Sequence, residues 1–133
     1  LSRARGVDTT DTVDAARDAA VALARYTGGA VVVSGEVDLI TDGTTVAKSH
    51  GGSPLMSKIT GCGCSQGGVL AVYACAGDPF TAAICGTAVY NVAGTRAAAV
   101  ADAPASFKVP FIDQLYRATA QDIADNRLEL EEA

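Results

Sequence analysis

The stretch YTGGAVVVSG, residues 26–35, decides the fold class of this chain. It joins an amphipathic segment to a continuous run, Ala30 to Val33, that contains no polar alternation. Such a run is typical of a strand covered on both faces, as in a parallel sheet with helices on each side. A helix, a short loop and a buried strand in this order predict an α/β fold.

Helical spacing and turn signals organise the rest of the chain. Apolar residues at helical spacing predict a helix over residues 11–26, capped by Thr10 or Asp11 and stopped at Gly28–Gly29. Residues 37–47 predict a hairpin with a two-residue turn at Asp42–Gly43. A buried helix over 69–76, a helix over 80–101, a loop over 102–110 and a last helix beginning at Pro110 and running to 127 follow. Residues 128–133 alternate apolar and acidic side chains, which fits a short edge strand or a frayed tail.

The composition indicates one acidic globular domain over residues 1–133. Hydrophobic residues make up 49% of the chain and charged residues 19%, which excludes an intrinsically disordered protein. The net charge of −5, without a Lys/Arg cluster, argues against nucleic-acid and anionic-membrane partners. No apolar stretch approaches the ~20 residues needed to cross a bilayer. We interpret the four cysteines as reduced thiols, and therefore expect a cytoplasmic protein.

The segment TGCGC, residues 60–64, lies where a loop becomes an apolar helix. Glycines at 61 and 63 let successive main-chain N–H groups turn toward one point, and the first helical turn adds unpaired donors and the positive end of its dipole. Gly61, Cys62 and Gly63 are therefore predicted to form an anion hole suited to a phosphoryl group. The thiol of Cys64, at the positive end of the helix, would accept a proton from an alcohol that attacks phosphorus.

Other interpretations of these residues stay open. The motif also fits an ordinary glycine turn in which the cysteines serve as small hydrophobic residues. A zinc site that adds Cys75 and Cys85 is disfavoured, because both lie in apolar helical patterns and paired C-x-x-C knuckles are absent. The single histidine, His50, is predicted to face solvent from a glycine-rich loop.

Three aspartates lie beside predicted turns: Asp8, Asp38 and Asp42. Short acidic side chains at turns bind nearby main-chain N–H groups more often than metal ions. We therefore predict that these residues act as caps and turn formers, and we expect no metal ligand among them.

The motifs GVDT, AVVVSGEVDLITDG, GGSPLM, KITGCGC and PASF, in this order, resemble the hydroxyethylthiazole kinases of the ribokinase-like superfamily. The resemblance extends over residues 6–127. Its most specific element is TGCGC, since sugar and vitamin kinases of this superfamily normally carry aspartate after the second glycine, where this chain has Cys64.

The resemblance implies a three-layer ribokinase-like sheet with flanking helices, of which this chain supplies the C-terminal portion. It also implies ATP- and Mg2+-dependent phosphorylation of the hydroxyethyl group of 4-methyl-5-(2-hydroxyethyl)thiazole in thiamine salvage, by a homotrimer. Carried over by motif position, Cys64 replaces the base aspartate, Gly61, Cys62 and Gly63 form the anion hole with Gly61 on the substrate side, and Ser34 contacts the nucleotide.

The chain departs from the family pattern at several positions. Ser34 replaces a threonine and Ser53 a histidine, while Ala103 and Ala105 replace glycines. The resemblance also implies that the Asn-x-x-Glu magnesium element, a nucleotide-contacting arginine and much of the thiazole pocket belong to a half that this chain lacks, so this chain alone is incomplete for catalysis. The alternatives are a kinase of the same superfamily for a pyrimidine or pyridoxal-type alcohol, and a non-catalytic half-domain.

Overall fold

The structure, a computed structural model, describes residues 13–133. It contains five α-helices, one 3₁₀ helix and four strands in the described residues, in the order α1 (Val13–Thr27), β1 (Val31–Val33), β2 (Asp38–Thr41), β3 (Thr45–Ser49), η1 (Pro54–Lys58), α2 (Cys62–Ala74), α3 (Pro79–Ala98), α4 (Pro104–Arg117), α5 (Ala120–Ala124) and β4 (Leu128–Glu132). Thr10, Asp11 and Asp8, the predicted caps near the start, lie outside the described residues.

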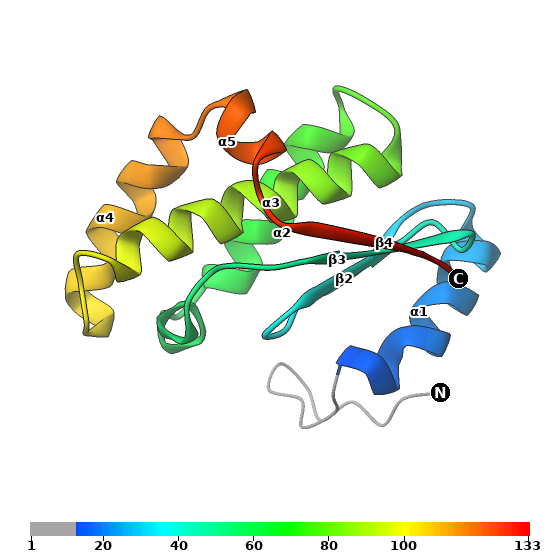
Figure 1. The fold of residues 1–133 in the computed structure, drawn as a ribbon, viewed down its shortest axis with the longest axis horizontal. Coiled ribbons are helices and arrows are strands. Elements are labelled where there is room, and N and C mark those ends of the chain that lie inside the picture. The colour runs from blue at the N-terminus through cyan, green and yellow to red at the C-terminus, as the bar shows by residue number, and fades with distance from the viewer. Residues whose placement is uncertain (1–12) are drawn as a thin grey trace.

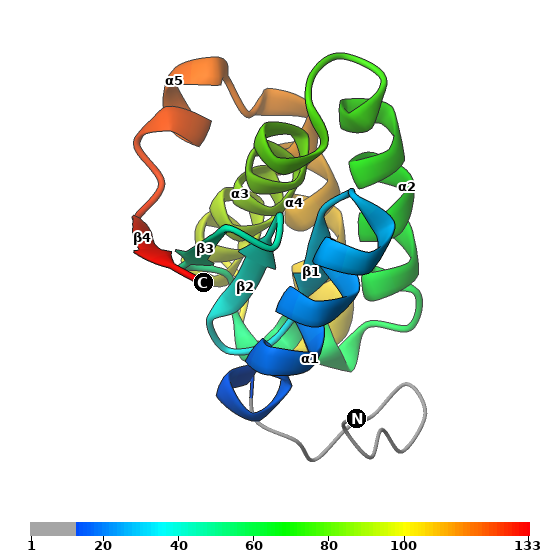
Figure 2. The ribbon, with the colours of Figure 1, turned by 90° about the vertical axis from the view of Figure 1, so that its right-hand side faces the viewer.

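The four strands form one sheet in the order β1-β2-β3-β4, with every neighbouring pair antiparallel. Helix α1 covers one face, where Leu39 and Val46 pack against Ala20 and Val21. Alternate residues Ile40 and Ala47 point to the opposite face and pack against Ala83 and other side chains of α3. Figure 2 shows α1 on one side of the sheet and α3 with α4 on the other, so the predicted three-layer α/β arrangement is confirmed.

Strand β1 is present where it was predicted, but the expected parallel pairing is wrong within residues 13–133. Val31 pairs with Thr41 and Val33 with Leu39, in an antiparallel ladder with β2. Only residues 34–37 separate the two strands, and a parallel connection needs a crossover of about a dozen residues or more. The three valines of β1 are half-buried.

The predicted hairpin of β2 and β3 is confirmed, but its turn is wider than the two residues expected. Thr41 pairs with Val46, which leaves four residues between the paired positions. The side chain of Asp42 holds this loop, because its Oδ1 accepts the N–H groups of Thr44 and Thr45, each at 2.8 Å. Hence Asp42 acts as a turn former, as its position predicted.

Helix α3 runs across the molecule (Figure 1). Several of its buried residues belong to the larger hydrophobic core. Its buried Val89, Tyr90 and Ala93 pack with Phe107 and Phe111 of α4. The rings of Tyr90 and Phe111 meet edge to face at a centroid distance of 5.3 Å. Asp78 begins α3, with its Oδ1 accepting the N–H of Thr81 at 3.0 Å, as an N-cap does.

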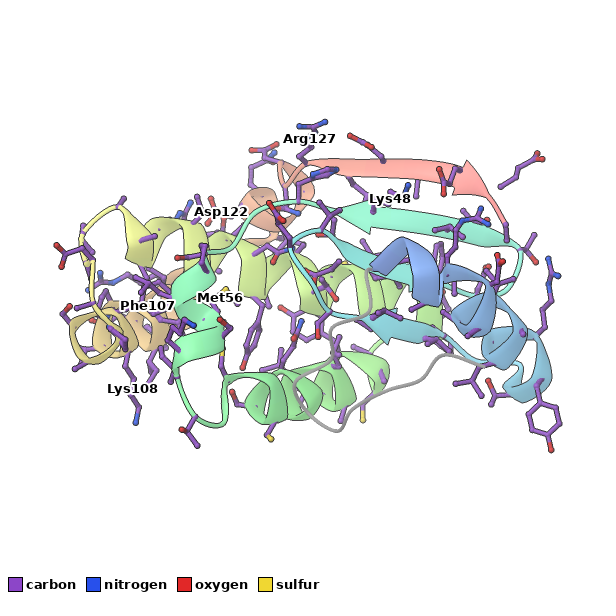
Figure 3. All side chains as sticks on the ribbon, turned by 90° about the horizontal axis from the view of Figure 1, so that it is seen from below. Lys48, Met56, Phe107, Lys108, Asp122 and Arg127 are labelled. Carbon is purple, nitrogen blue, oxygen red and sulfur yellow. The ribbon has the colours of Figure 1, made fainter. Side chains whose placement is uncertain are left out.

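The prediction of a loop before Pro110 is wrong, because α4 begins at Pro104 and contains Pro110 in its interior. A proline there cannot donate the helical hydrogen bond to the carbonyl of Ser106. The helix continues because Phe107 and Phe111, one turn apart, are both buried and stacked at a centroid distance of 5.6 Å. In Figure 3, Phe107 lies inside the molecule while its neighbour Lys108 points away from it.

Helix α2 is confirmed, but the prediction that it is buried is wrong for the described residues. Cys62 is its only buried residue, and Val72 is 69% exposed. Val69 and Tyr73 on one face pack toward α3, while Cys64, Ala71 and Cys75 on other faces are exposed. An apolar helix with an open face thus borders the cleft described below.

The segment after α5 forms an edge strand, β4, rather than a frayed tail. It pairs with β3 from Ser49–Leu128 to Thr45–Glu132. His50 is half-buried rather than solvent-facing, with its Nε2 3.2 Å from Oε1 of Glu129 on β4. None of the helices in residues 13–133 combines the length and the apolar character that crossing a bilayer requires.

Candidate active site

A cleft of about 710 Å³ opens where the turn after β1, the loop after β3 and the first turns of α2 approach one another. Loop and helix-end residues supply most of its lining, with one contribution from the middle of α3. The lining residues are Ser34, Gly35, Glu36, Gly51, Gly52, Ser53, Pro54, Met56, Ser57, Cys62, Gly63, Gln66 and Asn91.

Ser34 and Gly35 form the first wall, directly after β1. Ser34 is exposed to the cleft, and its hydroxyl both donates and accepts hydrogen bonds. A hydrogen bond fixes this turn, because the N–H of Gly35 donates to Oδ1 of Asp38 at 3.0 Å. The serine expected to contact a nucleotide therefore lies on the wall of a cleft.

Asp38 is almost completely buried, with 6% of its surface exposed. Its Oδ2 accepts a hydrogen bond from Nδ2 of Asn91 at 3.0 Å. Burial raises the pKa of this carboxyl above its ordinary value, and the hydrogen bonds from Gly35 and Asn91 only partly oppose that effect. Asp38 thus supports a turn, as predicted. Its carboxyl group is buried and is not part of the cleft lining.

Gly51 and Gly52 form the second wall, after β3. Both have left-handed backbone angles, with φ values of 118° and 83°, which favour glycine. The N–H of Gly52 donates to the main-chain oxygen of Asn91 at 3.0 Å and to Oγ1 of Thr95 at 2.9 Å. These bonds fasten the loop to α3. Ser53 then caps η1 by accepting the N–H of Leu55 at 3.2 Å.

The third wall is the start of α2, where Gly61 is the N-cap with a left-handed φ of 85°. The N–H of Cys62 donates to the carbonyl of Ile59 at 3.2 Å. Among the described residues, the N–H groups of Gly63 and Cys64 donate to no other group. Two main-chain donors at the positive end of a helix therefore remain available to an anion.

The two cysteines of this turn differ in their surroundings. Cys62 is buried and packs in the hydrophobic core formed with α3 and α4. Burial raises the pKa of its thiol, so the thiol stays protonated near neutral pH. Its part in the cleft is therefore that of a packed side chain. Cys64 is exposed and lies two residues after Cys62, in the first turn of α2.

The structure brings some of the predicted site residues together and leaves others at the rim. Ser34, Cys62 and Gly63 line the same cleft. Gly61 and Cys64 adjoin its lining but are not part of it. The roles of Cys64 as a base and of residues 61–63 as an anion hole stay predictions.

Sequence analysis missed four polar contributors to the cleft: Glu36, Ser57, Gln66 and Asn91. Asn91 is a single side-chain amide in a helix composed mainly of small apolar residues. The presence of a polar side chain in such a helix was the one signal in the sequence that could have identified it. Glu36 and Gln66 lie within two or three residues of predicted site residues, in segments whose side-chain directions the sequence does not specify.

Comparisons with known proteins bear on this site. The model of the hydroxyethylthiazole kinase family matches residues 2–121. The chain belongs to this family. It is 44% identical to a hydroxyethylthiazole kinase of Bifidobacterium longum (strain DJO10A) over 140 residues, which covers 95% of this chain and 45% of that protein. A hydroxyethylthiazole kinase of Roseobacter denitrificans is 46% identical over 111 residues, covering 84% of this chain and 43% of that one.

The fold comparison agrees with the family assignment. The solved structure of a hydroxyethylthiazole kinase protein from Pyrococcus horikoshii OT3 matches with a TM-score of 0.80 and 26% sequence identity, covering 90% of this chain and 47% of that one. The expected ribokinase-like kinase family and fold are confirmed. This chain spans about half the length of the relatives that it matches.

The described residues suit a phosphate group better than a magnesium ion. A phosphate group suits the free N–H groups of Gly63 and Cys64, since no heavy atom lies within 4 Å of the place where a Cβ would project from Gly61 or Gly63. For a metal ion, residues 13–133 contain no group of three or more His, Cys, Asp or Glu side chains. The described part of the chain therefore offers unpaired main-chain donors of the kind that suit a phosphate, and no preformed cluster of metal ligands.

Proposed function

We propose that this chain forms the phosphate-binding part of a kinase that transfers the γ-phosphoryl group of ATP to the hydroxyethyl group of 4-methyl-5-(2-hydroxyethyl)thiazole. The observation that carries the proposal is the cleft itself. It joins Ser34, after β1, to the unpaired amides at the start of α2, in a chain of the hydroxyethylthiazole kinase family. The proposal includes a cytoplasmic homotrimer that acts in thiamine salvage.

Phosphoryl transfer relies mainly on positioning and on neutralising charge. In the proposed reaction the substrate hydroxyl oxygen forms a bond to the γ-phosphorus, and the bond between that phosphorus and the bridging oxygen of ADP breaks. The N–H groups of Gly63 and Cys64 donate to the oxygens of the transferring group. The sulfur of Cys64 accepts the hydroxyl proton, and Ser34 donates to the nucleotide.

The other ligands of this reaction are assigned to the remainder of a full-length family protein. Magnesium would neutralise charge on the phosphates, and its ligands lie outside residues 13–133 in this proposal. Cys64 adjoins the cleft from the exposed side of α2, where the acceptor alcohol would approach. The same exposed side, with Val72 and Ala71, would be covered by the remainder of a full-length family protein in this proposal.

A chimaeric protein tests the proposal. This chain would replace the matching 45% of the Bifidobacterium longum relative, and the product would be assayed with ATP, Mg2+ and the thiazole alcohol. Formation of the phosphorylated thiazole is expected. A soluble, folded chimaera that makes no such product would reject the proposal, and a product only with pyridoxal or a pyrimidine alcohol would favour the second kinase hypothesis.

Replacement of Cys64 tests the assigned base. Cys64→Ala should lower kcat by about 10²- to 10⁴-fold, the usual effect of a general base, while the KM for ATP changes less than about threefold. Cys75→Ala, at another exposed cysteine just after α2, is the matched control and should leave kcat unchanged. Equal turnover in the wild-type chimaera and its Cys64→Ala variant would show that this thiol takes no part in proton transfer.

A further inference from the structure

Two walls of the cleft are short irregular segments, the turn at Ser34–Gly35 and the loop at Gly51–Gly52. Irregular segments of this kind need side-chain or main-chain bonds to hold one conformation. Both segments are held by the same residue of the middle of α3, Asn91, which is 4% exposed.

The side chain of Asn91 reaches the first wall through Asp38. Its Nδ2 donates one hydrogen bond to Oδ2 of Asp38 at 3.0 Å and another to Oγ of Ser49 at 2.9 Å. An amide nitrogen has two hydrogens, so both are used. The other carboxyl oxygen of Asp38 accepts the N–H of Gly35 at 3.0 Å. A continuous chain of bonds therefore runs from α3 to the turn after β1.

The main chain of Asn91 holds the second wall directly. Its carbonyl oxygen accepts the N–H of Gly52 at 3.0 Å. The side-chain Cβ of Asn91 also fills the space beside Gly51, since it lies 3.2 Å from the place where a Cβ would project from that glycine. Movement of Asn91 would shift both walls, and each wall is tied to the other through it.

We propose that Asn91 is a positioning residue that sets the distance between the Ser34–Gly35 turn and the Gly51–Gly52 loop, and thereby holds a nucleotide in line with the first turn of α2. The inference rests on the proposed kinase function. Asn91 does not act on the reacting atoms; it acts through Asp38 and Gly52.

Exchange of the two partners separates a positioning role from a purely structural one. Asn91→Asp places two carboxyl groups in contact and removes a donor, whereas Asp38→Asn places two amides in contact. The double variant, with Asn at 38 and Asp at 91, restores a donor facing an acceptor and keeps an oxygen for the N–H of Gly35. We expect each single variant of the chimaera to lower kcat/KM for ATP by about 10- to 100-fold, and the double variant to recover most of that loss.

Thr87→Val is the matched control in the same helix. Thr87 is completely buried and its Oγ1 has no hydrogen-bond partner among the described residues, so the isosteric change removes no bond. It should leave kcat/KM and the KM for the thiazole alcohol unchanged. Single variants of Asn91 and Asp38 that match this control, or a folded double variant without recovery, would overturn the inference.

A second measurement does not depend on catalysis. In the wild-type 133-residue chain, the N–H groups of Gly35 and Gly52 should be protected from hydrogen exchange. Asn91→Asp removes the side-chain donor to Asp38, so it should raise the exchange rate of Gly35, whereas Gly52, bonded to the main-chain oxygen of Asn91 and to Thr95, should change less. The double variant should restore protection at Gly35. Unchanged exchange in Asn91→Asp would refute the positioning role even if the chimaera proves inactive, while an inactive wild-type chimaera with the expected exchange pattern would reject only the proposed kinase function.

Discussion

Gly94→Ala tests whether α3 supports the cleft by close contact. A Cβ at Gly94 would lie 3.0 Å from Cα of Gly52 and would overlap Sδ of Met56. The thioether of Met56 can rotate away, but Gly52 is held by two hydrogen bonds to α3 and has a left-handed backbone. Relief of the contact therefore requires the Gly51–Gly52 loop to move outward.

The expected change in the free energy of unfolding is the difference between two opposing effects. Alanine is better than glycine in a helix interior by about 1 kcal/mol. Overpacking a close contact costs about 1–3 kcal/mol, with the central value near 2. The free energy of unfolding should therefore fall by about 1 kcal/mol, which corresponds to a decrease of roughly 3–5 °C in Tm for a chain of this size.

Gly86→Ala in the same helix is the matched control. Its added Cβ would meet Cδ2 of Leu70 at 2.8 Å, and this atom is the mobile end of a flexible side chain on α2. The cost of moving it is close to the helix-propensity gain, so Tm should change by less than about 2 °C. Thermal melts followed by circular dichroism would compare the two variants. Equal or higher Tm for Gly94→Ala than for Gly86→Ala would refute the close contact between α3 and the cleft loop.

Further predictions concern the core and one surface ion pair. Phe107→Ala empties a completely buried site and should lower the free energy of unfolding by about 3–5 kcal/mol in urea titrations, whereas Val109→Ala, at a position 65% exposed on the same helix, should change it by less than about 0.5 kcal/mol. The guanidinium of Arg96, bonded at 2.6 and 3.1 Å, lowers the pKa of Asp122 to about 2 from 3.8. Because the folded-state pKa is the lower one, the ion pair stabilises the fold above pH 3.8, and this stabilisation is lost as pH falls through about 2. The Tm difference between wild type and Asp122→Asn should therefore be constant above pH 5 and shrink toward pH 2. A Tm difference that does not depend on pH would contradict the assignment.

Local signals predicted the elements that local contacts determine. The glycine turn at Gly61 before α2 and the Asp42 turn were read from the identities of neighbouring residues, and both are present. The end of α1 near Gly28–Gly29 and the start of α3 after Asp78 follow the same rule. Caps and turns depend on bonds between residues two to four positions apart, so a single sequence carries them.

Packing between distant segments accounts for two features of the structure that the sequence did not reveal. Pro110 reads as the first residue of a helix, yet burial of Phe107 and Phe111 outweighs the hydrogen bond lost at that proline. Asn91 was missed because its partners Asp38 and Ser49 are 53 and 42 positions away in the sequence. No periodicity connects residues so far apart, and only the folded chain shows that Asn91 holds one wall through its side chain and the other through its main-chain oxygen.

The charge of the cleft explains why the proposed reaction needs more than this chain. Its lining contains main-chain N–H groups, hydroxyls and amides, and Glu36 is the only charged side chain among the described lining residues. Neutral donors fix the direction of a phosphate oxygen but leave most of the charge of a triphosphate unbalanced, and the chain itself has a net charge of −5. In the kinase proposal, the cations that complete the site must therefore approach from the open side, past Cys64 and the exposed face of α2. The half of the site described here would orient the phosphates, and the half that supplies positive charge would decide how tightly they bind.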